Sequence, residues 1–142
     1  APLGYTAEDV ANKNNTILNN SSTEYPTSGL VLVNLTAVKN IAANKLIIVN
    51  EQTNSTTPFL FASLTVIAGI YTISALIGSD KPAGLATLQV NNGATALKTL
   101  TITGALSWIA ASTLTLTSIT TLDFYLKSDS SLNIAFWKGI SL

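Results

Sequence analysis

Residues 68–77 read Ala-Gly-Ile-Tyr-Thr-Ile-Ser-Ala-Leu-Ile, and this stretch decides the fold class. After the Ala68-Gly69 turn signal, every second residue is apolar and would share one face of a strand: Tyr71, Ile73, Ala75 and Ile77. A period of two places alternate side chains on opposite faces of a strand, and aromatic and β-branched residues suit such a surface. The sequence therefore predicts a strand over residues 70–77 with one face in a core.

Similar short apolar runs, separated by turn residues, continue through the rest of residues 45–142. Asn91-Asn92-Gly93 is a strong signal for a tight hairpin, because asparagine and glycine accept positive φ angles. The expected strands cover residues 46–49, 59–67, 70–77, 86–90, 96–103, 108–117, 121–127 and 132–142. Strands this short and evenly spaced are typical of sandwiches and jelly rolls. We predict a mostly β protein with a jelly-roll β-sandwich head over residues 45–142.

The first 44 residues differ from this pattern. Residues 1–27 are rich in Asn and Ser and poor in large apolar groups, so they are expected to form an extended polar arm with no fold of its own. Pro26 restricts the chain before it, and Thr27 or Ser28 can cap a short helix over residues 28–44. Spacings of three and four place these residues on one seam of that helix: Ser28, Val31, Leu35, Val38 and Ala42. Such a seam seeks a partner, and we expect it to bring three chains together as a homotrimer.

Two other interpretations of residues 28–44 stay open. The helix can pack on its own head domain as an ordinary amphipathic helix. A strand is also possible, because residues 30–33 form a β-favouring run and Gly29 would cost the first helical turn about 1 kcal/mol.

The composition excludes several classes of function. The chain has 142 residues, of which 47% are hydrophobic and only 10% are charged; its seven basic residues are all Lys and are balanced by seven acidic ones. Without clustered Arg and Lys, nucleic-acid binding is not expected. No apolar run reaches the length of a membrane span, so membrane insertion is not expected either. So few charges favour a Thr-, Ser- and Asn-rich surface that is partly hidden in an oligomer.

No catalytic site is expected. The chain contains no His and no Cys, which removes the commonest general base and thiol chemistry. A glycosidase would need two carboxylates facing each other across a cleft, yet Asp123 is the only acidic residue on an expected strand. We predict a protein that is not an enzyme and has no cofactor.

Residues 4–13 of the arm read Gly-Tyr-Thr-Ala-Glu-Asp-Val-Ala-Asn-Lys, and a polar spacer then leads to Tyr25-Pro26-Thr27. This segment resembles one that recurs in bacteriophage tail fibres and receptor-binding proteins. In that family a similar motif precedes a Tyr-Pro and a short helix that leads into the distal domain. Asp9 departs from the family's commoner Asn, and the expected helix is more apolar than the family's. The resemblance implies a location in the virion or outside the cell.

Segments of the head carry a second resemblance: residues 68–75, residues 88–93, residues 100–104 with Trp108, residues 122–126 and residues 139–142. These segments resemble the galactose-binding-like jelly rolls that serve as carbohydrate-binding modules. A trimeric head like that of tumour necrosis factor is the rival. In the carbohydrate-binding family an acidic pair in the last strand commonly helps to hold a structural calcium, but here Lys138 and Gly139 stand at those positions. We therefore expect no metal, with Lys138 either replacing the ion or lying solvated at an edge.

A candidate glycan site follows from the alternation of side chains in the last two expected strands. If Leu122, Phe124 and Leu126 point inward, then Asp123 and Tyr125 point outward. In the last strand, Ile134 and Phe136 are expected inward and Trp137 outward, while Gln89 is the outward residue of a neighbouring strand. Rings and hydrogen-bonding groups together suit a sugar. The predicted ligand-binding set is Gln89, Asp123, Tyr125 and Trp137; the alternative for the two rings is a subunit or helix contact, and Trp108 is assigned to the core.

These features together favour the tip of a phage tail fibre or a related adhesin. The expected partners are two further copies of the chain, other virion proteins, and a bacterial surface polysaccharide or other glycan. Two alternatives remain: a structural virion component without sugar binding, and a monomeric carbohydrate-binding module of a polysaccharide-degrading enzyme.

Overall fold

A computed structural model describes residues 16–19, 24–26 and 45–142, and all regular structure within them is β-strand. The expected helix over residues 28–44 lies outside the described residues, as does most of the expected arm. The strands are β1 (Thr16–Asn19), β2 (Glu24–Pro26), β3 (Lys45–Thr53), β4 (Phe59–Val66), β5 (Gly69–Ser79), β6 (Leu85–Asn92), β7 (Thr95–Thr103), β8 (Ser107–Trp108), β9 (Ser112–Leu116), β10 (Thr120–Ser128) and β11 (Ala135–Ser141). No helical segment among these residues has the length and hydropathy that a membrane crossing requires.

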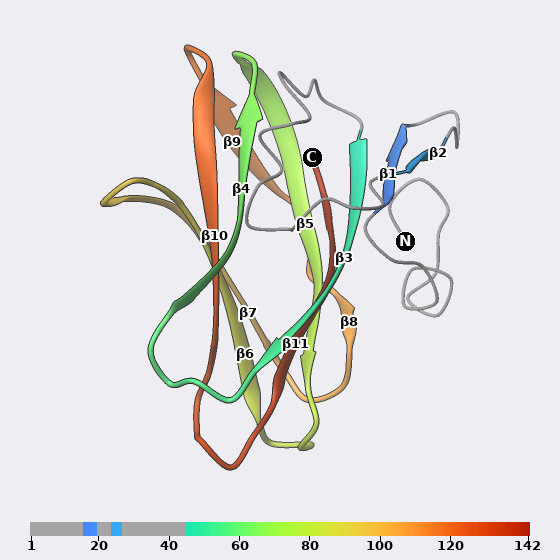
Figure 1. Cartoon of the computed structure of the whole chain (residues 1–142), viewed down its shortest axis with the longest axis vertical. Coiled ribbons are helices and arrows are strands. Elements are labelled where there is room, and N and C mark those ends of the chain that lie inside the picture. The colour runs from blue at the N-terminus through green and yellow to red at the C-terminus, as the bar shows by residue number, and fades with distance from the viewer. Residues whose placement is uncertain (1–15, 20–23, 27–44) are drawn as a thin grey trace.

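Two antiparallel sheets form the molecule (Figure 1). The larger sheet has the order β2-β1-β3-β11-β5-β8, with β9 also pairing to β5, and the smaller has the order β4-β10-β6-β7. From β3 to β11, most connections between consecutive strands cross from one sheet to the other. β3 and β11 themselves pair with each other in the larger sheet. This topology confirms the predicted jelly-roll β-sandwich.

Two segments of the expected arm pair with the head. β1 pairs antiparallel with β3, from Thr16 opposite Ile48 to Asn19 opposite Lys45, and β2 pairs with β1 in turn. Figure 1 shows β1 beside β3, and β2 beyond β1 at the border of the larger sheet. β1 therefore covers what would otherwise be an open edge of β3.

β5 has the alternation that its sequence predicts. Tyr71, Ile73, Ala75 and Ile77 are all buried in the core. The Tyr71 hydroxyl donates a hydrogen bond to the Ile67 carbonyl at 2.6 Å, which satisfies its polar end, and burial raises the pKa of this phenol. The predicted inward face of this strand is confirmed.

The second half of β5 is buried on both faces. A Cβ on Gly78 would lie only 2.4 Å from the Leu106 backbone nitrogen, so the segment before β8 passes directly over this strand. The Ile109 amide donates to the Ala75 carbonyl at 2.9 Å, and the Ser74 hydroxyl donates to the Ile109 carbonyl. Only glycine at position 78 allows so close an approach.

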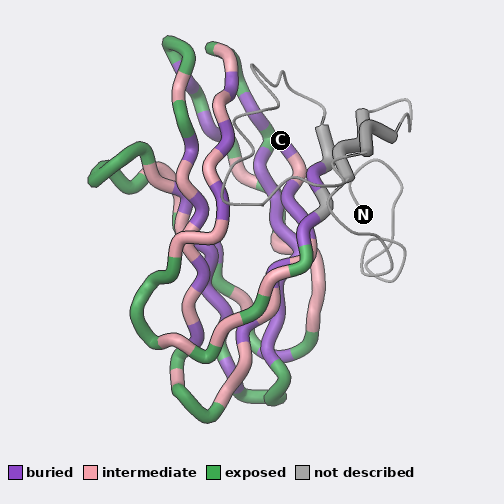
Figure 2. Tube along the Cα trace, viewed as in Figure 1, coloured by how far each residue is buried: buried purple, intermediate pink, exposed green. Residues whose placement is uncertain are grey.

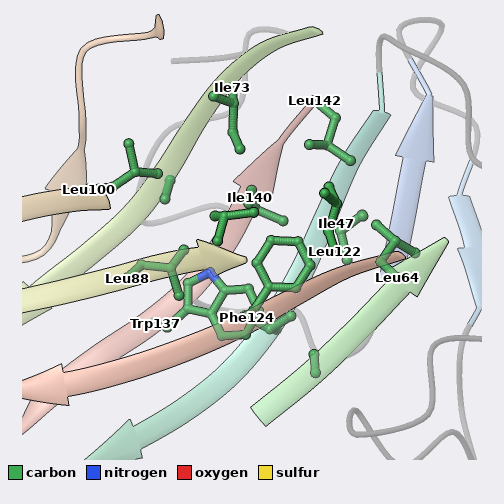
Figure 3. Packing of buried hydrophobic residues seen from close by; sticks show 14 of the residues in the cluster. Ile47, Leu64, Ile73, Leu88, Leu100, Leu122, Phe124, Trp137, Ile140 and Leu142 are labelled. Carbon is green, nitrogen blue, oxygen red and sulfur yellow. The ribbon is translucent and has the colours of Figure 1, made fainter. Parts of the chain in front are cut away.

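The core lies between the sheets and is centred on two aromatic rings (Figure 3). The rings of Phe124 in β10 and Trp137 in β11 are 5.3 Å apart between centroids and inclined by 31°. The Trp137 indole nitrogen donates to the Gly139 carbonyl at 3.0 Å, so the buried N–H is satisfied. Leu88 and Ile140 from facing sheets complete the cluster around the indole.

The burial of Trp137 corrects the predicted alternation in the last strand. Trp137 is fully buried, whereas Phe136 is half-buried on the other side of the sheet. The cause is a β-bulge between Trp137 and Gly139, which interrupts the register with both β3 and β5. Because a bulge inserts one residue, it reverses which residues point inward before it while leaving Ile140 inside. The assignment of Trp137 to an outward glycan site is therefore wrong.

Trp108 also departs from its expected place. The strand expected over residues 108–117 is divided into β8 and β9, and Trp108 lies opposite Leu76 at the edge of the larger sheet. It is half-buried and does not belong to the central hydrophobic cluster. Its indole N–H is shielded from solvent and has no hydrogen-bond partner in the described part of the chain.

Buried and exposed residues alternate along most strands, and the turns at both ends of the sandwich are exposed (Figure 2). The Asn91-Asn92-Gly93 stretch forms the predicted hairpin between β6 and β7, with Gly93 at a φ of 58°. This confirmed hairpin brings β6 and β7 together as neighbours in the smaller sheet.

Replacing Trp137 by Ala should lower the free energy of unfolding by about 3–5 kcal/mol, because it leaves a cavity against Phe124. Denaturant unfolding measures this loss. The matched control is Phe136→Ala, the neighbouring aromatic that is only half-buried, and it should cost less than half as much. Equal losses for the two variants would contradict the inward position of Trp137.

Candidate functional site

The candidate site lies on the outer face of the smaller sheet. In β10, Leu122, Phe124 and Leu126 are buried in the core. The residues between them, Asp123, Tyr125 and Lys127, are half-buried and lie on the opposite face. The alternation predicted for this strand is confirmed.

Tyr125 lies at the centre of one row of this face. It pairs directly with Gln89 of β6 on one side and with Leu60 of β4 on the other, and Gln89 pairs with Thr99 of β7. Directly opposed residues have Cβ atoms only about 4.5–5.5 Å apart, so their side chains are neighbours. A partly exposed phenol ring therefore stands between an amide and an apolar side chain.

Asp123 holds the surrounding elements in place. One carboxylate oxygen accepts a hydrogen bond from the Ser63 hydroxyl at 2.7 Å, and the other accepts from the Gly93 backbone amide at 3.2 Å. These bonds tie β10 to β4 and to the hairpin turn of β6 and β7. Asn91, opposite Asp123, has a side-chain oxygen that is buried and accepts no hydrogen bond from the described residues. Asp123 thus acts first as a structural support beside Tyr125.

Hydroxyl pairs reinforce the same face. Thr87 and Thr101 lie opposite each other with their hydroxyls 3.1 Å apart, and the hydroxyls of Thr65 and Thr121 are 3.2 Å apart. Lys127 lies opposite Thr87 and forms no ion pair within the part of the chain that the structure describes. These cross-strand contacts restrain the side chains of this face. The entropic cost of ordering them when a ligand binds is therefore lower.

Three of the four residues predicted for ligand binding share this face. Gln89, Asp123 and Tyr125 are brought together by the pairing of β6 with β10. Trp137 is behind them in the core and is not available to a ligand. Leu60 and Ser63 also border this site and were not predicted, because strand order and register decide which residues of β4 lie beside Tyr125 and Asp123, and no local motif reports them.

Lys138, at the position where no metal was expected, places a cation of the protein itself beside Asn50 and Phe136. The Lys138 ammonium donates to the Asn50 side-chain oxygen and lies 5.7 Å from the centroid of the Phe136 ring. Calcium needs six to eight oxygen ligands, with several carboxylates among them. No group of three His, Cys, Asp or Glu residues in the described ranges could hold a metal ion. The residues around Lys138 do not fit calcium.

Glu51 lies near this cation, since it pairs with Trp137 just before the bulge. Burial raises the pKa of the Glu51 carboxyl, and the positive charge of Lys138 opposes part of that rise. Removal from water outweighs the attraction, so the folded protein binds a proton at Glu51 more readily than the unfolded chain does.

The fold has counterparts among solved structures. No protein-family profile matches this chain, and no curated protein matches its sequence. The insecticidal delta-endotoxin Cry8Ea1 of Bacillus thuringiensis matches 64% of this chain with a TM-score of 0.50 and 12% identity, and the match spans only 18% of the toxin chain. At this identity the likeness extends to the β-sandwich fold alone.

Two carbohydrate-binding modules show weaker likenesses. A CBM36 module in complex with calcium and xylotriose matches 72% of this chain and 76% of its own, with a TM-score of 0.35 and 13% identity. The C-terminal CBM6 module of the laminarinase LamC from Zobellia galactanivorans matches the same shares, with a TM-score of 0.32 and 14% identity. Structural similarity this weak does not indicate a shared ligand.

Replacing Glu51 by Gln should increase the free energy of unfolding at neutral pH, because the amide avoids the cost of burying a charge. A carboxyl whose pKa is raised on folding destabilises the protein above that pKa, and this effect disappears as the pH falls below the ordinary value of 4.5. Urea unfolding of both proteins from pH 3.5 to 7.5 measures the difference. A gain that is independent of pH, or a loss at pH 7, would contradict this account.

Proposed function

We propose that the head is a non-enzymatic glycan-binding domain that contacts its ligand through the outer face of the smaller sheet. The observation that carries this proposal is the direct pairing of Tyr125 with Gln89 on a partly exposed face. The ring can cover the C–H side of a pyranose, and the amide can donate to and accept from its hydroxyls. Asp123 keeps the β6–β7 turn beside them.

The class of protein proposed is the tip of a bacteriophage tail fibre or a related adhesin, located in the virion or outside the cell. Its support is the segment at residues 4–13 with the later Tyr25-Pro26, which resembles the tail-fibre motif. The ligand would be a bacterial surface polysaccharide or another cell-surface glycan. Other virion proteins would be the partners of the N-terminal region, and three copies would assemble through residues 28–44.

Replacing Tyr125 by Ala should weaken glycan or cell binding by about five-fold or more, since an aromatic contact contributes roughly 1 kcal/mol. Gln89→Ala should weaken it to a similar extent through its lost hydrogen bonds. Both side chains are only half-buried, so the melting temperature should be retained. A glycan array followed by titration of the best ligand, or binding to intact bacteria, measures the effect.

The control for this experiment is Thr115→Ala, an exposed residue of β9 on the larger sheet, which should bind as the parent does. Tyr125→Phe retains the ring and separates stacking from the hydroxyl. Unchanged binding by both Tyr125→Ala and Gln89→Ala would reject this face. A protein that assembles but binds no glycan would instead favour a structural virion component.

The intact chain should have about three times the monomer mass by light scattering, because the helix expected over residues 28–44 would carry an apolar seam that needs a partner. Leu35→Asp should dissociate the assembly, since each chain would bury a charge at the axis. Ser28→Ala, a mild change on the same seam, is the control. A monomer at micromolar concentration would contradict the trimer, and a monomer that still binds glycan would favour a module of a polysaccharide-degrading enzyme.

A further inference from the structure

An open pocket lies at the end of the larger sheet where β3 finishes and β11 begins. It has a volume of about 370 Å³ and is lined by Gln52, Thr53, Asn54 and Ile134. The two walls of the pocket lie at the end of β3 and at the start of β11. They are side by side because Ala135 pairs with Thr53 and Phe136 pairs with Gln52. The volume is at the lower end of the range of about 300–1,000 Å³ that is usual for small-molecule sites.

Hydrogen bonds between loops hold both walls. The Ile134 amide donates to the Asp80 carboxylate at 2.7 Å, and the Asp80 amide donates back to the Ile134 carbonyl at 3.0 Å. On the other wall, the Asn54 side-chain amide donates to the Ser131 carbonyl at 3.3 Å, and the Thr53 hydroxyl accepts from the Ser55 amide at 3.0 Å. The pocket is therefore formed before any ligand arrives.

A second set of bonds fixes the loop that carries Ile134. Asp129 accepts hydrogen bonds from the Asn133 side chain at 2.9 Å and from the Leu85 amide at 3.1 Å. These two contacts hold the pKa of the Asp129 carboxyl below its usual value, so the bonds persist at neutral pH. The Ser128 hydroxyl donates to the Asn133 carbonyl at 3.0 Å, next to Ile134.

The lining has the chemistry of a site for a neutral polyhydroxyl ligand. All four lining residues are uncharged, and the nearby Asp80 carboxylate already accepts a backbone hydrogen bond. The Gln52 amide has no hydrogen-bond partner within the described residues, and the Asn54 side-chain oxygen accepts none there. The Thr53 oxygen accepts one bond, which leaves its proton free to be donated. Ile134 supplies the apolar wall.

We infer that this pocket binds a single neutral sugar unit, such as a hexose or an N-acetylhexosamine, at a second site that is separate from the face around Tyr125. Free amide and hydroxyl groups would bond the sugar hydroxyls, and Ile134 would contact the C–H groups or an acetyl methyl. The uncharged lining would disfavour uronic acids, whose carboxylate would lose water without gaining a cationic partner.

The test is a titration of the ¹⁵N-labelled full chain with glucose, galactose, N-acetylglucosamine and glucuronic acid, followed by amide NMR. At least one of the neutral sugars should produce saturable shifts at the Gln52 side chain and at the backbone amides of residues 53, 54 and 134. Gln52→Ala should weaken this binding by roughly three- to ten-fold, as expected for lost hydrogen bonds. Because Gln52 is exposed, the variant should keep the parent's melting temperature.

Gln89→Ala, the same substitution on the other sheet, is the matched control and should leave the pocket shifts unchanged. Sugar binding at the face around Tyr125 and sugar binding in the pocket shift the NMR signals of different backbone amides. The pocket proposal can therefore fail while the proposed function stands, and the reverse also holds. The inference is overturned if none of the neutral sugars shifts the pocket amides at tens of millimolar, or if Gln52→Ala leaves their titration unchanged. A preference for glucuronic acid would also overturn it.

Discussion

The β-bulge between Trp137 and Gly139 is the constraint on which the rest of the sandwich depends. Its extra residue places the Trp137 indole against Phe124 between the sheets and leaves Phe136 and Lys138 outside. The largest buried side chain of the head is thereby supplied by the strand that also pairs with both β3 and β5. A single local irregularity thus decides both the centre of the core and the character of the outer surface.

Local patterns predicted much of this fold. The inward face of β5, the alternation in β10 and the Asn-Asn-Gly hairpin depend on neighbours in the sequence, and the structure has all three. The bulge depends on two other strands, so simple alternation from Ile134 put Phe136 inside and Trp137 outside. Trp108 was misplaced for a related reason, because β8 and β9 each pair with a different part of β5, far earlier in the chain, and no local pattern reports the break between them.

The candidate site was predictable to the same extent as the strands that carry it. Asp123 and Tyr125 follow from alternation within β10, and their meeting with Gln89 follows from strand order. The two carboxylate oxygens of Asp123 already accept hydrogen bonds from the Ser63 hydroxyl and the Gly93 amide. Tyr125 and Gln89 are therefore the groups that are available to a ligand. The loop pocket has no local signature, since its walls come from residues 52–54 and 134, about eighty positions apart in the chain.

The pairing of β1 with β3 has a consequence for how the head can be separated from the residues before it. β3 is flanked by β11 on one side and by β1 on the other, and β1 lies more than twenty-five residues before Lys45. A fragment cut at Lys45 would uncover the edge of β3 over residues 45–48 and leave the amides and carbonyls that face β1 unsatisfied. Such an open edge is a template for adding a foreign strand, so β1 protects this part of the head against aggregation.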